Sequence, residues 1–386
     1  MCDEKAAATR HELAELPALR VRPGGDVRKN EQFEPIHEFP VEQPIVHHLS
    51  VDQLPLSALD SGKRFSRRRL LCLLERYMQK TALLFAGQGA QAVGMGRDLV
   101  ERFPTAQTLF ERANETLGYD LASVCFNGPE LELKKTENAQ PGIFVVSWAA
   151  FCLLRERCPT LRFEAAAGLS LGEFTALAAV GAMSFEDGLK VVHSRGQVMH
   201  EACEVTHGTM AAIMGLDEAT TRQICEEAGV VLANLNCPAQ LVISGESDRI
   251  SKACELAQLR GAKRALALNV AGAYHSPLMA SAQPKLAAAL ATVEFKTPPT
   301  IVVSNVTAQP HGSPVEIRQR LVEQVTASVR WEDSMRFLLG QGFTDFIELG
   351  PGAALSGFLR RIDKSARVLN VADTASLDAT CQALAA

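Results

Sequence analysis

The motif Gly168-Leu169-Ser170-Leu171-Gly172 restricts the local backbone more than any other stretch of the chain. It follows the small-residue run "EAAAG" and precedes "EFTALAAVGAMS", an order typical of a buried strand followed by a helix. Glycines two positions before and after a serine remove Cβ atoms that would collide with the backbone in a tight strand-to-helix turn. The G-x-S-x-G pattern therefore favours a nucleophilic serine. The competing hypothesis is a glycine-rich turn whose serine only caps the helix.

Short apolar runs and helical patterns on both sides of this motif predict an α/β domain. "TALLFAG", which begins at Thr81, is typical of a buried strand, and "AQTLFERANETLG" of a helix that ends at Gly118. We predict a buried helix over residues 142–154, beginning near Pro141. The chain then returns through "TIVVSNV" and "TDFIELGPG". We assign residues 80–207 and 274–372 to a large α/β-hydrolase-like domain with a parallel sheet.

Residues 208–273 have a different pattern, which predicts a small inserted subdomain. Strand and helix patterns follow one another in the order βαββαβ, with Asp217 as the cap of the first helix and Gly229 as its end. This order is the ferredoxin-like arrangement.

The two ends of the chain lie outside both domains. Residues 1–79 contain scattered prolines and predict an irregular extension, and residues 373–386 a C-terminal tail. The segment "SGKRFSRRRLLCLLERYMQK" is an organelle-targeting remnant, a patch for an acidic partner, or a solvated basic linker. Acidic residues near the start fit a simple transit peptide poorly. Localisation therefore stays open between the cytoplasm and an organelle (plastid or mitochondrion).

Composition excludes several classes of function. A net charge of -5 gives no general case for nucleic-acid binding, and the longest uncharged apolar run is too short for a membrane span. The ten cysteines form no CxxC pair and have no histidines at zinc-ligand spacing, so we expect no metal site. Ten scattered cysteines in a chain of this length favour reduced thiols and a reducing compartment.

A nucleophilic serine needs a base and an oxyanion site. Of the nine histidines, His275 follows a strand and a glycine loop, where catalytic groups are commonly placed; the others lie in the extension, in helical patterns or in polar turns. Spacing alone does not decide among them. "FAGQGAQAVGMGRDL" is a second glycine-rich turn, whose N–H groups can approach a ligand, but its glycines do not have dinucleotide-binding spacing.

Seven segments together resemble the malonyl-CoA:acyl-carrier-protein transacylases of type II fatty-acid synthesis. The segments occur in one order over residues 81–372: "FAGQGAQAVGMG", "GLSLGEFTALAAVGAMSFEDGLKVVHSRGQVM", "GTMAAIMGL", "NCPAQLVISG", "GAKRALALNV", "AYHSPLM" and "ELGPGAALSG". The resemblance implies that Ser170 carries the malonyl group as an ester and that His275 acts as base and then acid. It places the oxyanion donors at the backbone N–H groups of Gln88 and Leu171. The backbone carbonyl that orients the histidine falls at Arg330.

The resemblance also assigns the substrate and the partner. Arg195 would bind the free carboxylate of the malonyl group, which acetyl-CoA lacks, through two parallel hydrogen bonds. Acyl carrier protein would be the acceptor, no cofactor would be needed, and the enzyme would be a monomer. The chain departs from the family's pattern at Leu169, where a histidine is usual, and at Ala86, where a proline is usual.

Two other functions remain possible from the sequence. A serine thioesterase or hydrolase would use the same elbow with water as acceptor and would not need Arg195. A non-catalytic scaffold that binds carrier protein is suggested only by Leu169.

Overall fold

The computed structural model of the chain describes residues 80–386. The predicted extension over residues 1–79, with most of its basic segment, lies outside the described residues. No helix in the described part is both long and apolar enough to cross a membrane.

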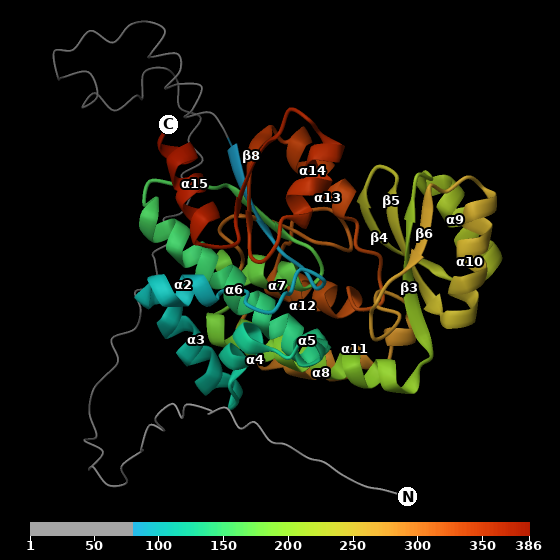
Figure 1. Ribbon diagram of the computed structural model, residues 1–386, viewed down its shortest axis with the longest axis horizontal. Helices are drawn as coiled ribbons and strands as arrows, with labels where there is room; N and C mark the ends of the chain where they lie inside the picture. Colours follow the sequence, from blue (N-terminus) through green and yellow to red (C-terminus); the bar gives the residue numbers. More distant parts are fainter. Residues whose placement is uncertain (1–79) are drawn as a thin grey trace, which may run out of the picture. The chain divides into compact units, whose positions relative to one another are not determined.

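A five-stranded parallel sheet forms the centre of the large domain, in the order β7-β2-β1-β8-β9 (Figure 1). The predicted parallel sheet is therefore confirmed. Its strands are β1 (Lys80–Phe85), β2 (Ala165–Gly168), β7 (Ile301–Val303), β8 (Phe343–Leu349) and β9 (Arg367–Val371). The central strands β1 and β2 are almost wholly buried, as parallel strands covered by helices on both faces are.

Alternate residues of β1 belong to two separate apolar clusters on the two faces of this sheet. Leu83 and Phe85 pack in the cluster that contains helices α3, α6, α7 and α8, whereas Ala82 and Leu84 pack in the cluster that contains α13 and α14. The helices of this domain are α2 (Arg97–Arg102), α3 (Pro104–Leu117), α4 (Leu121–Asn127), α5 (Glu130–Lys134), α6 (Thr136–Arg157), α7 (Leu171–Ala179), α8 (Phe185–Val205), α11 (Ala282–Ala291), α12 (Pro314–Glu323), α13 (Trp331–Gly340), α14 (Ala354–Ile362) and α15 (Thr374–Ala385).

Helix α6 begins earlier than predicted. It starts at Thr136, so Pro141 lies inside the helix rather than at its first position. A proline has no N–H to donate to the carbonyl four residues before it, here that of Glu137. The Nδ1–H of His193 on α8 donates to this carbonyl at 3.2 Å. A contact from a neighbouring helix thus replaces the missing hydrogen bond, and the helix continues through the proline.

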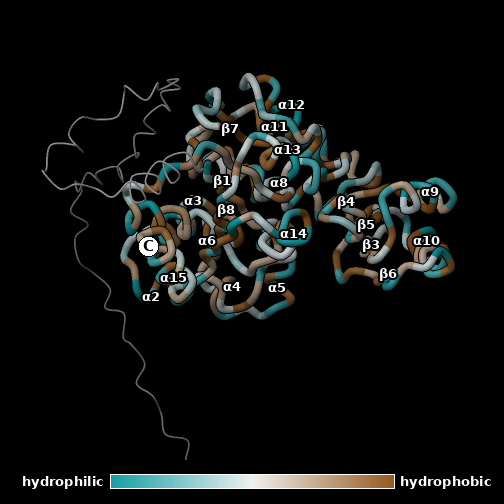
Figure 2. Tube along the Cα trace, turned by 90° about the horizontal axis from the view of Figure 1, so that it is seen from above, coloured by the Kyte–Doolittle hydropathy of each residue, from teal (hydrophilic) through white to brown (hydrophobic). Residues whose placement is uncertain are grey.

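The inserted segment forms a four-stranded antiparallel sheet in the order β4-β5-β3-β6, with α9 and α10 on the side away from the large domain (Figures 1 and 2). This confirms the predicted ferredoxin-like arrangement. Its elements are β3 (Gly208–Met214), α9 (Glu218–Ala228), β4 (Val231–Cys237), β5 (Gln240–Glu246), α10 (Ser247–Leu259) and β6 (Arg264–Ala267). Asp217 accepts from the N–H of Thr220, and Gly229 ends α9 in a left-handed conformation, as predicted. The exact domain boundaries stay predictions.

The end of the chain is not a separate tail, contrary to the prediction for residues 373–386. Residues 374–385 form α15, which buries Leu377 in the apolar cluster shared with α6. Asp378 on α15 forms ion pairs with Arg102 and Arg157. The helix is therefore part of the large domain.

Candidate active site

Ser170 lies in the turn between β2 and α7, in a strained backbone conformation. Its φ is 52° and its ψ is -101°, a region that costs about 1–3 kcal/mol for a residue other than glycine. A Cβ on Gly168 would lie 1.9 Å from the carbonyl carbon of Gly172, and a Cβ on Gly172 would lie 2.1 Å from the carbonyl oxygen of Phe85. The two glycines therefore permit the tight turn that the sequence predicted.

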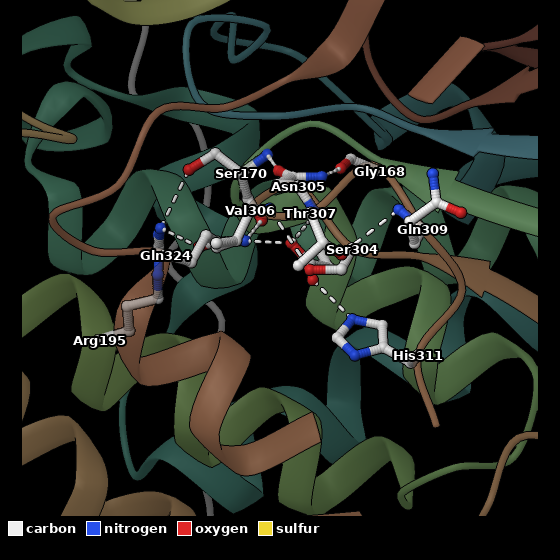
Figure 3. Close-up of polar contacts among 11 residues, drawn as sticks. Gly168, Ser170, Arg195, Ser304, Asn305, Val306, Thr307, Gln309, His311 and Gln324 are labelled. Carbon is white, nitrogen blue, oxygen red and sulfur yellow. Dashed lines mark hydrogen bonds and ion pairs between the residues drawn. The ribbon is translucent and has the colours of Figure 1, made fainter. Parts of the chain in front are cut away.

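Asn305, which follows β7, holds this turn from the side. Its Oδ1 accepts from the Ser170 backbone N–H at 2.6 Å, and its Nδ2 donates to the Gly168 carbonyl at 2.7 Å. Figure 3 shows Asn305 between these two residues. The sequence analysis did not single out Asn305. Its position two residues after a parallel strand was the available signal, since loops at the carboxyl ends of such strands form sites.

His275 and Arg195 both contact the Ser170 hydroxyl. The Nε2 of His275 lies 2.8 Å from Ser170 Oγ, and an Arg195 guanidinium nitrogen donates to the same oxygen at 3.0 Å. All three are largely buried, with exposed fractions of 9% for Ser170, 5% for His275 and 1% for Arg195. The structure thus brings Ser170 into contact with Arg195, 25 positions later in the sequence, and with His275, 105 positions later.

The orienting carbonyl belongs to Gln324, so the prediction of Arg330 is wrong. His275 Nδ1–H donates to the Gln324 carbonyl at 2.9 Å. Gln324 follows α12 as its C-terminal cap, where backbone carbonyls lack helical partners and can accept from elsewhere. The Arg330 carbonyl instead accepts from the N–H and hydroxyl of Ser334 at the start of α13. A main-chain acceptor has no side-chain signature, but the end of a predicted helix marks where one is available.

This hydrogen bond fixes the histidine tautomer. With Nδ1 protonated, Nε2 is free to accept the serine proton. Burial, followed by the neighbouring Arg195 cation, lowers the pKa of His275 to about 4. The imidazole is therefore neutral at pH 7, which a general base requires.

Arg195 is a buried cation held by two glutamines. One guanidinium nitrogen donates to Gln140 Oε1 at 2.8 Å, and the other donates to Gln324 Oε1 at 2.9 Å. The guanidinium also lies over the Phe174 ring, 5.3 Å from its centre. Burial lowers the pKa of Arg195 to about 10, which still leaves it charged at neutral pH.

Gln88 and Leu171 lie in the two turns that follow β1 and β2. Leu171 is the first residue of α7, so its N–H has no helical acceptor. Among residues 80–386, neither the Gln88 nor the Leu171 backbone N–H donates to a protein group. Both are available to a ligand, and their assignment as oxyanion donors stays a prediction.

Within the described part of the chain, no group of three or more His, Cys, Asp and Glu side chains could hold a metal ion. The polar groups around Ser170 are arranged for acyl transfer: a hydroxyl, a neutral imidazole, free N–H groups and a buried cation.

Comparisons with known proteins agree with this chemistry. The acyl transferase domain family matches residues 82–378. A malonyl CoA-acyl carrier protein transacylase of Bacillus subtilis is 42% identical over 312 residues, which cover 80% of this chain and 98% of the relative. The structure of such a transacylase from Coxiella burnetii is similar with a TM-score of 0.76 and 36% identity, covering 79% and 97% of the two chains. A malonyl-transacylase solved with its type II PKS acyl-carrier protein has a TM-score of 0.77 and 37% identity, covering 79% and 100%. The chain therefore belongs to the acyl transferase domain family.

Proposed function

We propose that the protein transfers a malonyl group from malonyl-CoA to the phosphopantetheine thiol of acyl carrier protein. The observation that carries this proposal is the contact of one buried hydroxyl, Ser170 Oγ, with both the His275 imidazole and the Arg195 guanidinium. The relatives named as malonyl CoA-acyl carrier protein transacylases support the same substrate and acceptor.

The first half of the reaction makes a malonyl ester on Ser170. His275 Nε2 takes the hydroxyl proton as Oγ attacks the thioester carbonyl carbon. The Gln88 and Leu171 N–H groups stabilise the oxyanion of the tetrahedral intermediate, at about 3–4 kcal/mol for each donor in comparable sites. Collapse of the intermediate breaks the carbon–sulfur bond, and the leaving CoA thiolate takes the proton from His275.

The second half repeats these steps with a new nucleophile. The phosphopantetheine thiol gives its proton to His275 and attacks the ester carbonyl. The intermediate collapses to the malonyl thioester, and Ser170 regains its proton. The order is ping-pong, because CoA leaves before the acceptor reacts.

Arg195 selects the malonyl group by its charge. The guanidinium can donate two parallel hydrogen bonds to the free carboxylate, and the carboxylate would replace the present contact between Arg195 and Ser170 Oγ. Binding this anion would also offset the cation that helps to lower the pKa of His275. Substrate binding would thereby raise the basicity of the imidazole when it is needed.

The test is the mass of the intact protein after incubation with malonyl-CoA, followed by addition of holo acyl carrier protein. We expect a malonyl mass increment that persists until the carrier protein is added and then moves to it. A thioesterase would release free malonate without carrier protein, and a scaffold would show no increment.

We propose in addition that the reaction supplies extender units for fatty-acid synthesis, needs no cofactor and is performed by a monomer. A reducing compartment, either the cytoplasm or an organelle, is the proposed location. A fluorescent fusion of the full chain and a sedimentation measurement test the location and the monomer.

A further inference from the structure

A buried carboxylate beside the site, Glu173, has no role in the steps above. It lies on the first turn of α7 with no exposed surface. Its Oε1 lies 2.7 Å from His311 Nε2, and its Oε2 accepts from the Asn305 backbone N–H at 3.2 Å and from Gln324 Nε2 at 2.5 Å. Burying an ionised carboxylate is costly unless donors surround it, and here three do.

Glu173 determines which way the Gln324 amide faces. A glutamine amide can turn by half a rotation, which exchanges its oxygen and its nitrogen. An ionised carboxylate only accepts hydrogen bonds, so the amide nitrogen must face Glu173. The amide oxygen is then left facing Arg195, from which it accepts at 2.9 Å.

The same glutamine also reaches the nucleophile and the base. Its Nε2 donates to the Ser170 carbonyl at 3.0 Å, and its own carbonyl accepts from His275 Nδ1. Its position therefore affects the serine, the histidine and the arginine together.

His311 forms the outer end of this series of contacts. Its side chain is fully buried, and its Nδ1 has no partner among the described residues. The side chain is thus held through Nε2 alone, where it donates to Glu173. In Figure 3, His311 and Arg195 approach the cluster from opposite sides.

We propose that Glu173 is a positioning residue that orients Gln324, and through it Arg195 and His275, and that His311 holds Glu173 in place. The inference rests on the proposed function, because its readout is malonyl loading.

The test uses Glu173→Gln, which keeps the size and removes the charge, in the full chain. The rates of malonyl and acetyl loading are followed by intact mass. We expect malonyl loading to fall by about 10- to 100-fold, the range for a hydrogen bond to a charged group. We also expect the ratio of the malonyl loading rate to the acetyl loading rate to fall, because only the malonyl group has a carboxylate that Arg195 can bind. A rate and ratio equal to those of the unchanged chain would overturn the proposal.

Glu348→Gln is the matched control for a purely structural carboxylate. Glu348 is also buried, and it accepts from the backbone N–H groups of Leu355 and Ser356 at 3.0 and 2.7 Å, at the start of α14. Its loss should lower the melting temperature without changing the ratio. If Glu173→Gln behaves in the same way, Glu173 has only a structural role.

A second pair of variants keeps the test decisive if Glu173→Gln does not fold. His311→Gln retains an N–H donor toward Glu173, whereas His311→Ala removes it. The malonyl loading rate and the ratio of the malonyl to the acetyl loading rate should be retained in His311→Gln and fall in His311→Ala. Equal values in the two variants would overturn the role of His311. If the unchanged chain takes no malonyl group, the proposed function fails first.

Two cysteine thiols lie close together at a place that takes no part in the proposed reaction. The thiols of Cys158, at the end of α6, and Cys381, on α15, lie 3.2 Å apart although 223 positions separate them in the sequence. Both residues are partly exposed. Asp378, one turn before Cys381, pairs with Arg157 and Arg102 at 2.7 and 2.9 Å and holds α15 beside the end of α6.

We infer that Cys158 and Cys381 form a disulfide by exchange with a low-molecular-weight disulfide such as oxidised glutathione. In the first step one of the two thiols attacks a glutathione sulfur as its thiolate and releases one glutathione thiol. The other protein thiol then displaces the second glutathione as its own thiolate, so that two glutathione thiols form and the protein loses two electrons and two protons.

Peptide mapping of the full chain after treatment with oxidised glutathione tests this inference. We expect a cross-linked peptide that joins Cys158 to Cys381, a mass lower by two hydrogens, and loss of both in Cys158→Ser. Cys254→Ser is the control, since Cys254 is also a partly exposed free thiol, and it should retain the cross-link. The inference would be overturned if treatment gave mixed disulfides with glutathione and no cross-link, or no change at all.

Discussion

The turn around Ser170 and the antiparallel subdomain differ in whether their charged side chains are buried. Near Ser170 a carboxylate, a guanidinium and an imidazole are all buried, and both Ser170 and His275 have positive φ angles. In the subdomain the core is mainly apolar, with side chains such as Ile243. Its buried polar residues, such as Ser244, are neutral, and the capping carboxylate of Asp217 is exposed. Buried charge therefore distinguishes the turn around Ser170 from the subdomain, as expected where chemistry takes place.

This difference shows what each region needs from its surroundings. A buried charge is tolerated only where neighbours from several elements satisfy it, and α6, α7, α8 and α12 all contribute to the site. The subdomain needs only matching apolar faces and ordinary helix caps. Substitutions in the site should therefore change activity, and substitutions in the subdomain should change only stability.

Ser170→Ala should have the largest effect, because it removes the atom that forms the ester. We expect malonyl loading to fall by at least about 10³-fold, to below detection by intact mass. Ser244→Ala is the matched control in the subdomain. Ser244 is a fully buried serine whose hydroxyl has no partner in the described part, and its loss should leave loading unchanged. A malonyl increment on the Ser170→Ala protein would contradict the assignment.

Arg195→Gln should lower malonyl loading by roughly 10²-fold and acetyl loading much less. The substitution removes a charged donor from the carboxylate, and hydrogen bonds to charged groups contribute about 1.5–3 kcal/mol each. Loading rates with malonyl-CoA and acetyl-CoA give the comparison. Arg249→Gln, which removes an exposed ion pair with Glu246 in the subdomain, should change neither rate. If the malonyl and acetyl loading rates fell by the same factor, Arg195 would have no role in selecting the substrate.

The same Arg195→Gln protein should also have a shifted pH profile. Acetyl loading requires a neutral His275, so its rate rises with pH through the pKa of this group, which burial and Arg195 lower to about 4. Removing the cation removes one of the two lowering causes, so the acid midpoint should move to higher pH by about one unit. The measurement is kcat/KM for acetyl-CoA between pH 3.5 and 8, within the range where the protein stays folded. A midpoint that stays or moves lower would contradict this electrostatic coupling.

The sequence predicted the regions in which local pattern determines structure. The strand at Thr81, the end of α3 at Gly118 and the βαββαβ order were all readable, because apolar periodicity and capping residues act over a few positions. Ser170 was predicted for a related reason, since it lies in a distinctive glycine-rich turn, whereas the choice of His275 among nine histidines came from the resemblance to the transacylases.

The remaining parts depend on contacts between distant segments. The carbonyl that orients His275 was predicted six positions too late, because any residue can supply a main-chain acceptor. Glu173 and His311 become partners only when the end of β7 lies beside α7. Pro141 was expected to start a helix but lies inside α6, where a donor from His193 on another helix replaces the hydrogen bond that the proline cannot make.

Asp217→Ala should have the smallest effect and tests the other side of the comparison. It removes the side-chain acceptor for the Thr220 N–H at the start of α9, which typically costs about 1 kcal/mol of stability and lowers the melting temperature by about 2 °C. Because this cap lies in the subdomain and contacts none of the site residues, malonyl loading at 25 °C should be unchanged. Asp217→Asn retains a capping oxygen and should keep the original melting temperature. If Asp217→Ala lowered loading several-fold while the protein stayed folded, the subdomain would contribute to the site, and the separation between the site and the subdomain would fail.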